Sequence, residues 1–291
     1  MRFYAIADLH LTVKTPRCRI DKYSDTQFEK LNWIFNVVNQ SREKCLVIAG
    51  DIFDRASEPY HVVKKFISLL KNYPLIKIYC VAGQHDQRFH TQGLDNTPLG
   101  IMEEFNVTIL KKKNINGIDF IGESWGEKPT NTNGDILVTH KMIIEDVPLF
   151  EQQENYISAK NILRDSGFKI IISGDNHLPF ACKTKNKLLI NCGSVMRSSK
   201  NQRNHTPFLW QVETDGKFLK IPIPIRRKVF NVSLEEEGQE QETNKNLDDF
   251  ITYVSRNENQ PNFQQVLKNI IQNNPLTDEV ENKINTIMET V

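Results

Sequence analysis

The residues of this chain that could do chemistry are aspartates, histidines and one glutamine that directly follow short apolar runs. They form five groups in order along the sequence: Asp8-x-His10, Gly50-Asp51-Ile52-Phe53-Asp54, Gly83-Gln84-His85-Asp86, His140, and Gly174-Asp175-Asn176-His177. Carboxylates and imidazoles with little cysteine favour harder divalent metals such as Mn²⁺, or Fe or Zn. A carboxylate between two cations is the natural bridge of a two-metal centre, which clamps the oxygens of a phosphoryl group. Together the groups predict metal-assisted phosphoryl chemistry.

The elements that must position these groups are predicted strands, each ending where a group begins. These strands are residues 2–7, 45–49, 76–82, 136–139 and 168–172. Apolar side chains at helical spacing predict helices at 26–39 and 60–72, and further strands are predicted at 188–191, 208–212 and 218–221. This order predicts an α/β fold with mixed sheets. Ligands bind at the carboxyl ends of strands in such sheets, so the groups should converge there. A single Gly-Asp pair is more often a turn, and only the ordered set favours a site.

The composition is that of a globular protein, with 291 residues, 39% of them hydrophobic and 25% charged. A formal net charge of +1 gives no overall basic field, so contact with a nucleic acid would need a local patch. No apolar run approaches the roughly 18 residues of a membrane helix, and the N-terminus does not read as a signal peptide. The 5 cysteines are scattered without a C-x-x-C pair, which favours reduced thiols. We therefore expect a cytoplasmic protein with no membrane segment.

The chain changes character after residue 225. Residues 226–244 contain a basic triplet and a run rich in glutamate, which predict a solvated acidic linker. Residues 245–291 contain three short amphipathic patterns punctuated by prolines, which predict a small C-terminal helical segment.

The ordered motifs resemble those of the calcineurin-like metallophosphoesterase superfamily. Within it the chain is most similar to SbcD-type DNA-repair nuclease subunits of bacteria and phages, through Gly50-Asp51-Ile52-Phe53-Asp54, His85-Asp86-Gln87-Arg88-Phe89-His90 and Gly193-Ser194-Val195-Met196-Arg197. The resemblance covers about residues 1–225. It implies a nuclease domain there, folded as a β-sandwich of two mixed sheets flanked by helices, with a small C-terminal helical appendage. It also implies a bacterial or phage-infected cell as the setting.

The resemblance implies a set of metal ligands. One divalent metal ion would be held by Asp8, His10, Asp51 and His177, and a second by Asp51, Gln84, His140 and Asp175. The chain departs from the family twice, because the family usually has Asn at the position of Gln84 and His at that of Asp175. A charged oxygen at position 175 favours Mn²⁺ or Mg²⁺ over Zn²⁺ at the second site. We expect two divalent cations, Mn²⁺ with Mg²⁺ as the alternative.

The resemblance also implies catalytic and substrate residues. His85 would assist at the scissile phosphate without binding metal, and Asp86 would orient it. Arg88, His90 and Arg197 are candidate substrate contacts. Asp54 is expected to be a structural loop residue rather than a ligand.

The predicted function is a dinuclear-metal phosphodiesterase that uses a metal-bound hydroxide and acts on DNA as an exo- or endonuclease in recombination or repair. The family implies a homodimer that works with an SbcC-like ATPase, and residues 245–291 would bind that partner or form a reduced capping domain. Two alternatives stay open. One is a phosphoesterase for nucleotides or cyclic nucleotides, and the other is a scaffold of the same fold whose metal site has degenerated.

Overall fold

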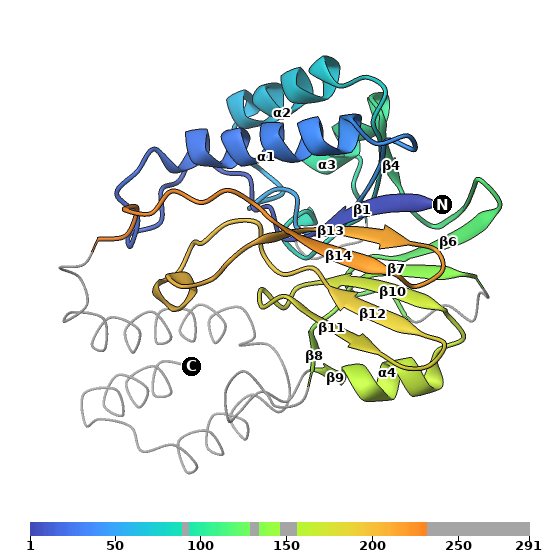
Figure 1. The fold of residues 1–291 in the computed structure, drawn as a ribbon. Helices are drawn as coiled ribbons and strands as arrows, with labels where there is room; N and C mark the ends of the chain where they lie inside the picture. Colours follow the sequence, from blue (N-terminus) through green and yellow to red (C-terminus); the bar gives the residue numbers. More distant parts are fainter. Residues whose placement is uncertain (89–92, 129–133, 146–155, 232–291) are drawn as a thin grey trace, which may run out of the picture. The chain divides into compact units, whose positions relative to one another are not determined.

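The computed structural model describes residues 1–88, 93–128, 134–145 and 156–231. Within these residues the chain forms two six-stranded sheets and one two-stranded sheet. Figure 1 shows the two large sheets as layers, with α1 and α2 above them and α4 below. The helices are α1 (Tyr23–Asn39), α2 (Tyr60–Asn72), α3 (Pro98–Ile101) and α4 (Ala159–Asp165), with 3₁₀ turns at η2 (Met102–Glu104) and η3 (Lys200–Gln202).

The first sheet has the strand order β14-β13-β1-β2-β3-β4. Its members are β14 (Phe218–Pro222), β13 (Phe208–Glu213), β1 (Arg2–Ile6), β2 (Cys45–Ala49), β3 (Lys77–Val81) and β4 (Val107–Ile109). The strands β1 to β4 pair in parallel, while β13 pairs antiparallel with both β1 and β14. The carboxyl ends of the parallel strands therefore lie along one edge of this sheet.

The second sheet has the order β11-β12-β10-β7-β6-β5. Its members are β11 (Phe180–Lys183), β12 (Leu188–Asn191), β10 (Ile170–Gly174), β7 (Ile136–His140), β6 (Ile118–Glu123) and β5 (Lys112–Ile115). Its four central strands are parallel, and β5 and β11 are antiparallel edge strands. The short strands β8 (Ile143–Ile144) and β9 (Ile157–Ser158) pair separately. The prediction of two mixed sheets flanked by helices is confirmed.

Alternate residues of the strands face different cores, because side chains on a strand point to opposite faces. Leu46 and Ile48 of β2 pack in the core beneath α1 and α2. Val47 and Ala49 of the same strand pack between the two sheets. A third core lies on the outer face of the second sheet, where Leu163 of α4 contributes. The two sheets are thus held face to face by a shared apolar layer, which fixes the positions of their strand ends.

Several elements differ from the sequence predictions, and β4, β11 and α4 are absent from them. Helix α1 begins at Tyr23 instead of residue 26, and β10 ends at Gly174 instead of residue 172 because Gly174 pairs in register with His140. The hairpin of β5 and β6 is absent from the predicted strands. Its turn is Asn116-Gly117, where both residues have positive φ, and this dipeptide is a strong hairpin signal.

The compact unit extends from Met1 to Asn231, beyond the predicted boundary at residue 225. The backbone N–H of Asn231 donates to the carbonyl of Cys18, and the ring of Phe230 lies 5.3 Å from the guanidinium of Arg19. Residues 226–231, predicted as the start of the linker, therefore pack on this unit. The predicted helical segment 245–291 lies outside the described residues.

All 5 cysteines are free thiols, in agreement with the prediction from their spacing. No helix in the described part of the chain is long and apolar enough to cross a membrane.

Lys30 of α1 provides a test of the packing of this unit. Its side chain is buried and its ammonium donates to the carbonyl of Val195 at 2.7 Å. Burial, followed by the charges of Arg197 and Arg19, lowers the pKa of Lys30 from 10.5 to about 7. Between these two pKa values the unfolded chain binds a proton that the folded protein lacks. The contribution of Lys30 to stability should therefore rise with pH, by up to about 1.4 kcal/mol per pH unit.

Urea unfolding of the wild type and Lys30→Met at several pH values between 7 and 10 measures this effect. As pH rises, the unfolding free energy of the wild type should increase relative to that of Lys30→Met. Lys64→Met is the control, because Lys64 is exposed on α2. Parallel stability curves for wild type and Lys30→Met would contradict the prediction.

Candidate metal centre

The polar groups singled out in the sequence converge where the two sheets present their strand ends. Asp8, Asp51 and Gln84 follow β1, β2 and β3 of the first sheet, whereas His140 ends β7 and Asp175 follows β10 of the second. The site is thus built across the two sheets, and neither sheet alone carries it.

Asp51 lies at the middle of this cluster. Its Oδ2 is 3.4 Å from His140 Nε2, 3.7 Å from His10 Nε2 and 3.9 Å from His85 Nε2. The Nε2 atoms of His10 and His177 are 3.3 Å apart. A single carboxylate therefore faces imidazoles from three different segments of the chain, which is the placement expected of a bridging ligand.

Three overlapping sets of side chains have ligand atoms within 4.8 Å of one another among the described residues. These sets are Asp8, His10 and His177; His10, Asp51 and His85; and Asp8, Asp51 and His140. Because Asp8 and Asp51 each belong to two sets, the geometry suits two neighbouring cations that share carboxylates.

The hydrogen bonds of His140 fit a metal ligand. Its Nδ1 lies 2.7 Å from the carbonyl oxygen of Ala49, so Nδ1 carries the proton and donates it. In the neutral form of the ring, Nε2 then keeps its lone pair for a cation, and this buried atom has no hydrogen-bond partner. Metal-binding histidines commonly donate their second N–H to a carbonyl in this way. Asp8 Oδ2 and Gln84 Oε1 are also buried without a partner, so the unsatisfied atoms are electron-pair donors suited to a cation.

Gln84 and Asp175, the two positions where the chain departs from the family pattern, are hydrogen-bonded to each other. Gln84 Nε2 donates to Asp175 Oδ1 at 3.0 Å, and the Asp175 backbone N–H donates to Asp8 Oδ1 at 3.2 Å. The amide of Gln84 is thus held by its nitrogen, which leaves its oxygen as the atom without a partner. Asp175 Oδ1 lies 4.0 Å from His140 Nε2, within the same cluster.

The backbone at the site is strained. Asp8, His10, Asp51 and Asp175 have φ values of 52°, 44°, 50° and 81°. Residues with a Cβ rarely adopt this left-handed conformation, which costs on the order of 1–3 kcal/mol and is concentrated at functional sites. Only two other non-glycine residues of the described chain, Lys44 and Asn116, share it. In this conformation the backbone turns sharply after each strand, so that the side chain enters the cluster.

Two glycines allow the side chains to approach the backbone closely. A Cβ built on Gly83 would lie 2.0 Å from Asp51 Oδ1, and one built on Gly50 would lie 2.2 Å from His140 Nδ1. Any side chain at either position would therefore displace a candidate ligand.

The electrostatics of the cluster follow from burial and from the carboxylates. Burial raises the pKa of Asp8 to about 6, and burial lowers the pKa of His10 to about 3. Burial also opposes protonation of His140, but the carboxylates of Asp51, Asp8 and Asp175 outweigh it and raise its pKa to about 10. The carboxylates thus favour positive charge at His140 Nε2, which is the place where a cation would bind.

His85 is the histidine of the site that reaches furthest into solvent, with a side chain 42% exposed. Its Nδ1 lies 2.8 Å from the backbone carbonyl of Asp54, so Nδ1–H is the donor and Nε2 faces the cluster. The carboxylate of Asp54 also lies 3.6 Å from His10 Nδ1. The backbone carbonyl of Asp54 therefore positions His85, a role that the sequence prediction of a structural loop residue did not contain.

Asp86 has a different role from the one the resemblance implied. Its buried carboxylate accepts hydrogen bonds from the backbone N–H groups of Ile52, Phe53 and Gly83. Burial and the neighbouring charge of Asp51 raise its pKa to about 7. Asp86 ties together the loops after β2 and β3, and the bond that orients His85 comes from Asp54 instead.

Of the three residues predicted to contact substrate, the structure describes two, and these lie in different surroundings. Arg197 is buried, and its guanidinium donates to the carbonyls of Arg203 and Arg226 at 2.8 Å and 2.6 Å. It therefore braces the segment that ends at Asn231, which corrects the prediction of a substrate contact. Arg88 is exposed on the loop that follows His85, and His90 lies outside the described residues.

The family profile described as Metallophos: Calcineurin-like phosphoesterase matches residues 1–179. No curated protein matches the chain. Among solved structures, an archaeal phosphodiesterase is 15% identical with a TM-score of 0.43, covering 76% of this chain and 99% of its own. A Vps29 mutant from Entamoeba histolytica is 13% identical with a TM-score of 0.38, covering 77% of this chain and 100% of its own.

Gly83→Ala tests the close approach at the strand end. The new Cβ would collide with the carboxylate and the backbone nitrogen of Asp51, so we expect a loss of about 1–3 kcal/mol in unfolding free energy. Titration calorimetry should also show weaker Mn²⁺ binding. Gly93→Ala is the control, since a Cβ there would meet nothing within 4 Å. Wild-type stability and Mn²⁺ affinity in Gly83→Ala would contradict the tight packing described.

Proposed function

Since this chain belongs to the calcineurin-like phosphoesterase family, we propose that it is a DNA nuclease of the SbcD type, acting as an exo- or endonuclease in recombination or repair. Family membership and the candidate ligand cluster make it a metal-dependent phosphoesterase. The observation that supports a two-metal site is the cluster of overlapping ligand sets that share Asp8 and Asp51. The choice of DNA as substrate rests on the motif resemblance.

The residues of the cluster divide between two cations in this proposal. Asp8, His10 and His177 would hold the first, and Gln84, His140 and Asp175 the second, with Asp51 shared between them. When bound, the two cations activate water as a nucleophile and offset the charge on the phosphate oxygens. Mn²⁺ or Mg²⁺ suits the second group, because His140 is its only nitrogen ligand.

His85 would serve the leaving group. Its Nδ1–H is held by the carbonyl of Asp54, which fixes the ring so that Nε2 faces the cluster. In the imidazolium form, Nε2–H can donate a proton to the oxygen that departs from phosphorus. Its side chain is 42% exposed, so a substrate can reach this ring from solvent.

The proposal also includes two protein partners. A homodimer and an SbcC-like ATPase are expected from the resemblance, and residues 245–291 are the segment that we assign to the ATPase contact or to a reduced capping domain.

Two alternative functions remain, and the substrate that the protein hydrolyses distinguishes them from a nuclease. A phosphoesterase for nucleotides or cyclic nucleotides would use the same ligands, and the net charge of +1 is compatible with it. A degenerate scaffold is disfavoured because Asp8, Asp51 and His140 come together with His85 beside them.

A nuclease assay tests the proposed function directly. Labelled single-stranded and double-stranded DNA should be cut in the presence of Mn²⁺, and EDTA should abolish cutting. Hydrolysis of cyclic nucleotides without any cutting of DNA would favour the small-molecule alternative. Absence of bound Mn²⁺ would favour the scaffold.

Two variants separate metal binding from proton transfer. Asp51→Asn should lose activity together with metal at both positions, because this carboxylate is shared. His85→Ala should keep its metal content while turnover falls by roughly 10²–10⁴, the usual contribution of a positioned acid. His61→Ala, an exposed position of α2, is the control and should match the wild type. Two bound metals in Asp51→Asn would overturn the bridging assignment.

Asp175→His tests the second metal position. The substitution replaces a carboxylate oxygen by an imidazole nitrogen, which Zn²⁺ accepts readily. Calorimetric titrations should show tighter Zn²⁺ binding and a shift of selectivity away from Mn²⁺. Identical isotherms for the variant and the wild type would mean that position 175 does not contact the metal.

A further inference from the structure

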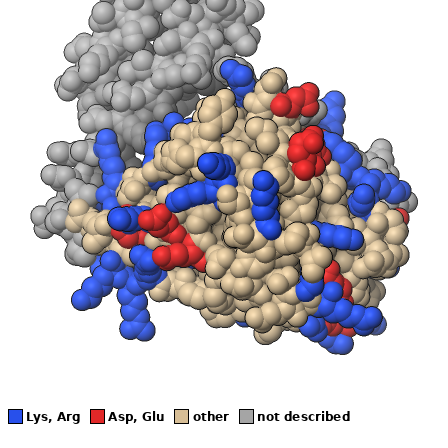
Figure 2. Space-filling model, turned by 90° about the horizontal axis from the view of Figure 1, so that it is seen from above, with Lys and Arg blue, Asp and Glu red and all other residues tan. Residues whose placement is uncertain are grey.

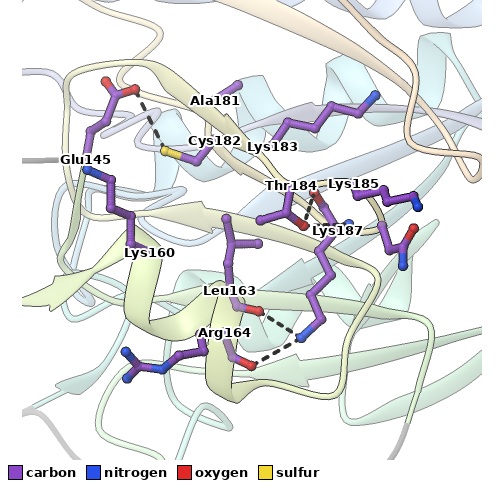
Figure 3. Close-up of a pocket in the computed structure, with 11 residues that line it drawn as sticks. Glu145, Lys160, Leu163, Arg164, Ala181, Cys182, Lys183, Thr184, Lys185 and Lys187 are labelled. Atoms are coloured by element: carbon purple, nitrogen blue, oxygen red, sulfur yellow. Dashed lines mark hydrogen bonds between the residues drawn. The ribbon is translucent and has the colours of Figure 1, made fainter.

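A basic groove lies on the outer side of the second sheet, apart from the metal centre. It has a volume of about 680 Å³ and is bounded by α4 and by the hairpin of β11 and β12. Figure 3 shows the side chains that line it. The charged ones are Lys160, Arg164, Lys183, Lys185, Lys187 and Glu145.

One side of the groove is the solvent-facing surface of α4. Lys160 and Arg164 are four residues apart, so they lie on the same face of the helix, while Ala159 and Leu163 are buried against the sheet. Like charges at this spacing destabilise a helix slightly. Arg164 forms an ion pair with the exposed Asp165 at 2.7 Å, which offsets part of that cost.

The other side is the turn between β11 and β12, where Lys183, Lys185 and Lys187 alternate along the chain. The turn is closed by two hydrogen bonds, from the backbone N–H of Thr184 to the carbonyl of Lys187 at 2.9 Å and from the Lys187 N–H to Thr184 Oγ1 at 3.1 Å. These bonds define the shape of the turn, so its lysines are presented on a fixed backbone.

Lys187 and Lys183 use some of their N–H donors in hydrogen bonds to backbone carbonyls. The ammonium of Lys187 donates to the carbonyls of Leu163 and Ser166 at the end of α4, and that of Lys183 donates to the carbonyl of Gly216. Figure 3 shows Lys187 reaching down to α4, whereas Lys183 and Lys185 extend outward from the turn. Lys183 therefore keeps two of its three N–H donors for a ligand.

The charge of the groove is out of proportion to that of the chain. Its lining contains five basic side chains and one acidic one, although the whole chain has a net charge of only +1. The face seen from above in Figure 1 also carries many basic side chains, which Figure 2 shows spread over the surface with fewer acidic ones between them. A local concentration of one sign attracts a polyanion.

We propose that this groove binds the sugar-phosphate backbone of a DNA substrate at a distance from the metal centre. The inference rests on the proposed function and names a second contact surface for the same substrate. Strand β11 begins three residues after His177 and ends at Lys183. Because β12 runs parallel to β10, the turn between β11 and β12 lies at the amino-terminal edge of the second sheet, opposite the strand ends of the metal centre. Lys183 is six residues beyond His177, so at about 3.3 Å per residue the chain spans at most roughly 20 Å between them. A duplex of one helical turn, about 34 Å long, can cover both.

The test is the salt dependence of DNA binding by the full chain. Fluorescence anisotropy with a labelled duplex longer than one helical turn, in EDTA, measures binding without cleavage. The double variant Lys183→Gln and Lys185→Gln should bind about tenfold or more weakly than the wild type. Its slope of log affinity against log salt should be smaller by about 1.8, because each phosphate contact contributes about 0.9.

The matched control removes the same charge elsewhere. Lys64→Gln with Lys65→Gln alters two exposed lysines of α2, and it should keep the wild-type affinity and slope. Equal affinity in the wild type and the groove variant, or an equal loss in both double variants, would overturn the proposal. Full competition by inorganic phosphate at matched ionic strength would also overturn it, because it would indicate a site for a single phosphate.

The two proposals fail in different ways. Hydrolysis of bis-p-nitrophenyl phosphate with Mn²⁺ should be the same in the groove variant and the wild type, since neither lysine belongs to the metal centre. A wild type that never cuts DNA contradicts the nuclease assignment. A groove variant that binds DNA normally contradicts only the groove.

Discussion

The candidate metal centre depends on one buried carboxylate. Asp51 is 1% exposed and faces His10, His85 and His140, which come from different segments of the chain. Burial alone would raise the pKa of this carboxyl group, but the imidazoles around it lower the pKa instead. Because an ionised group in this position needs positive charge or hydrogen bonds on every side, the surrounding loops are arranged around it. The His85 backbone N–H meets part of this need by donating to Asp51 Oδ1 at 3.0 Å.

The same requirement explains the unusual backbone. The chain turns into the left-handed region at Asp51, and at Gly50 before it, and Gly83 lies against the carboxylate. Asp86 secures these turns by accepting three backbone N–H groups from the loops after β2 and β3. Strain at the site is thus offset by buried hydrogen bonds close by, and the apolar layer between the sheets keeps both sets of strand ends at fixed separation.

Charges of opposite sign gather at two different places of the described unit. Carboxylates gather at the strand ends, where cations would bind, and lysines gather at α4 and the turn after β11. In the proposed complex with DNA, cations at the first place would attract phosphate at short range, and the lysines at the second would contact the sugar-phosphate backbone without regard to sequence. The near-zero net charge of the chain conceals this separation.

The sequence by itself determined the strand-end positions of the polar groups, because apolar runs predict strands and chemistry follows their carboxyl ends. It therefore indicated Asp8, Asp51 and His140 as neighbours, as well as the mixed α/β fold. The tertiary structure decided what depends on contacts between distant segments. Only there does Asp54 orient His85, Asp86 bind loop amides, and the guanidinium of Arg197 turn to backbone carbonyls. Residue type does not reveal which backbone carbonyl or N–H a side chain will bind, because all residues except proline carry the same groups. The burial of an arginine likewise depends on what packs over it. These roles could therefore not be predicted from residue identity and spacing.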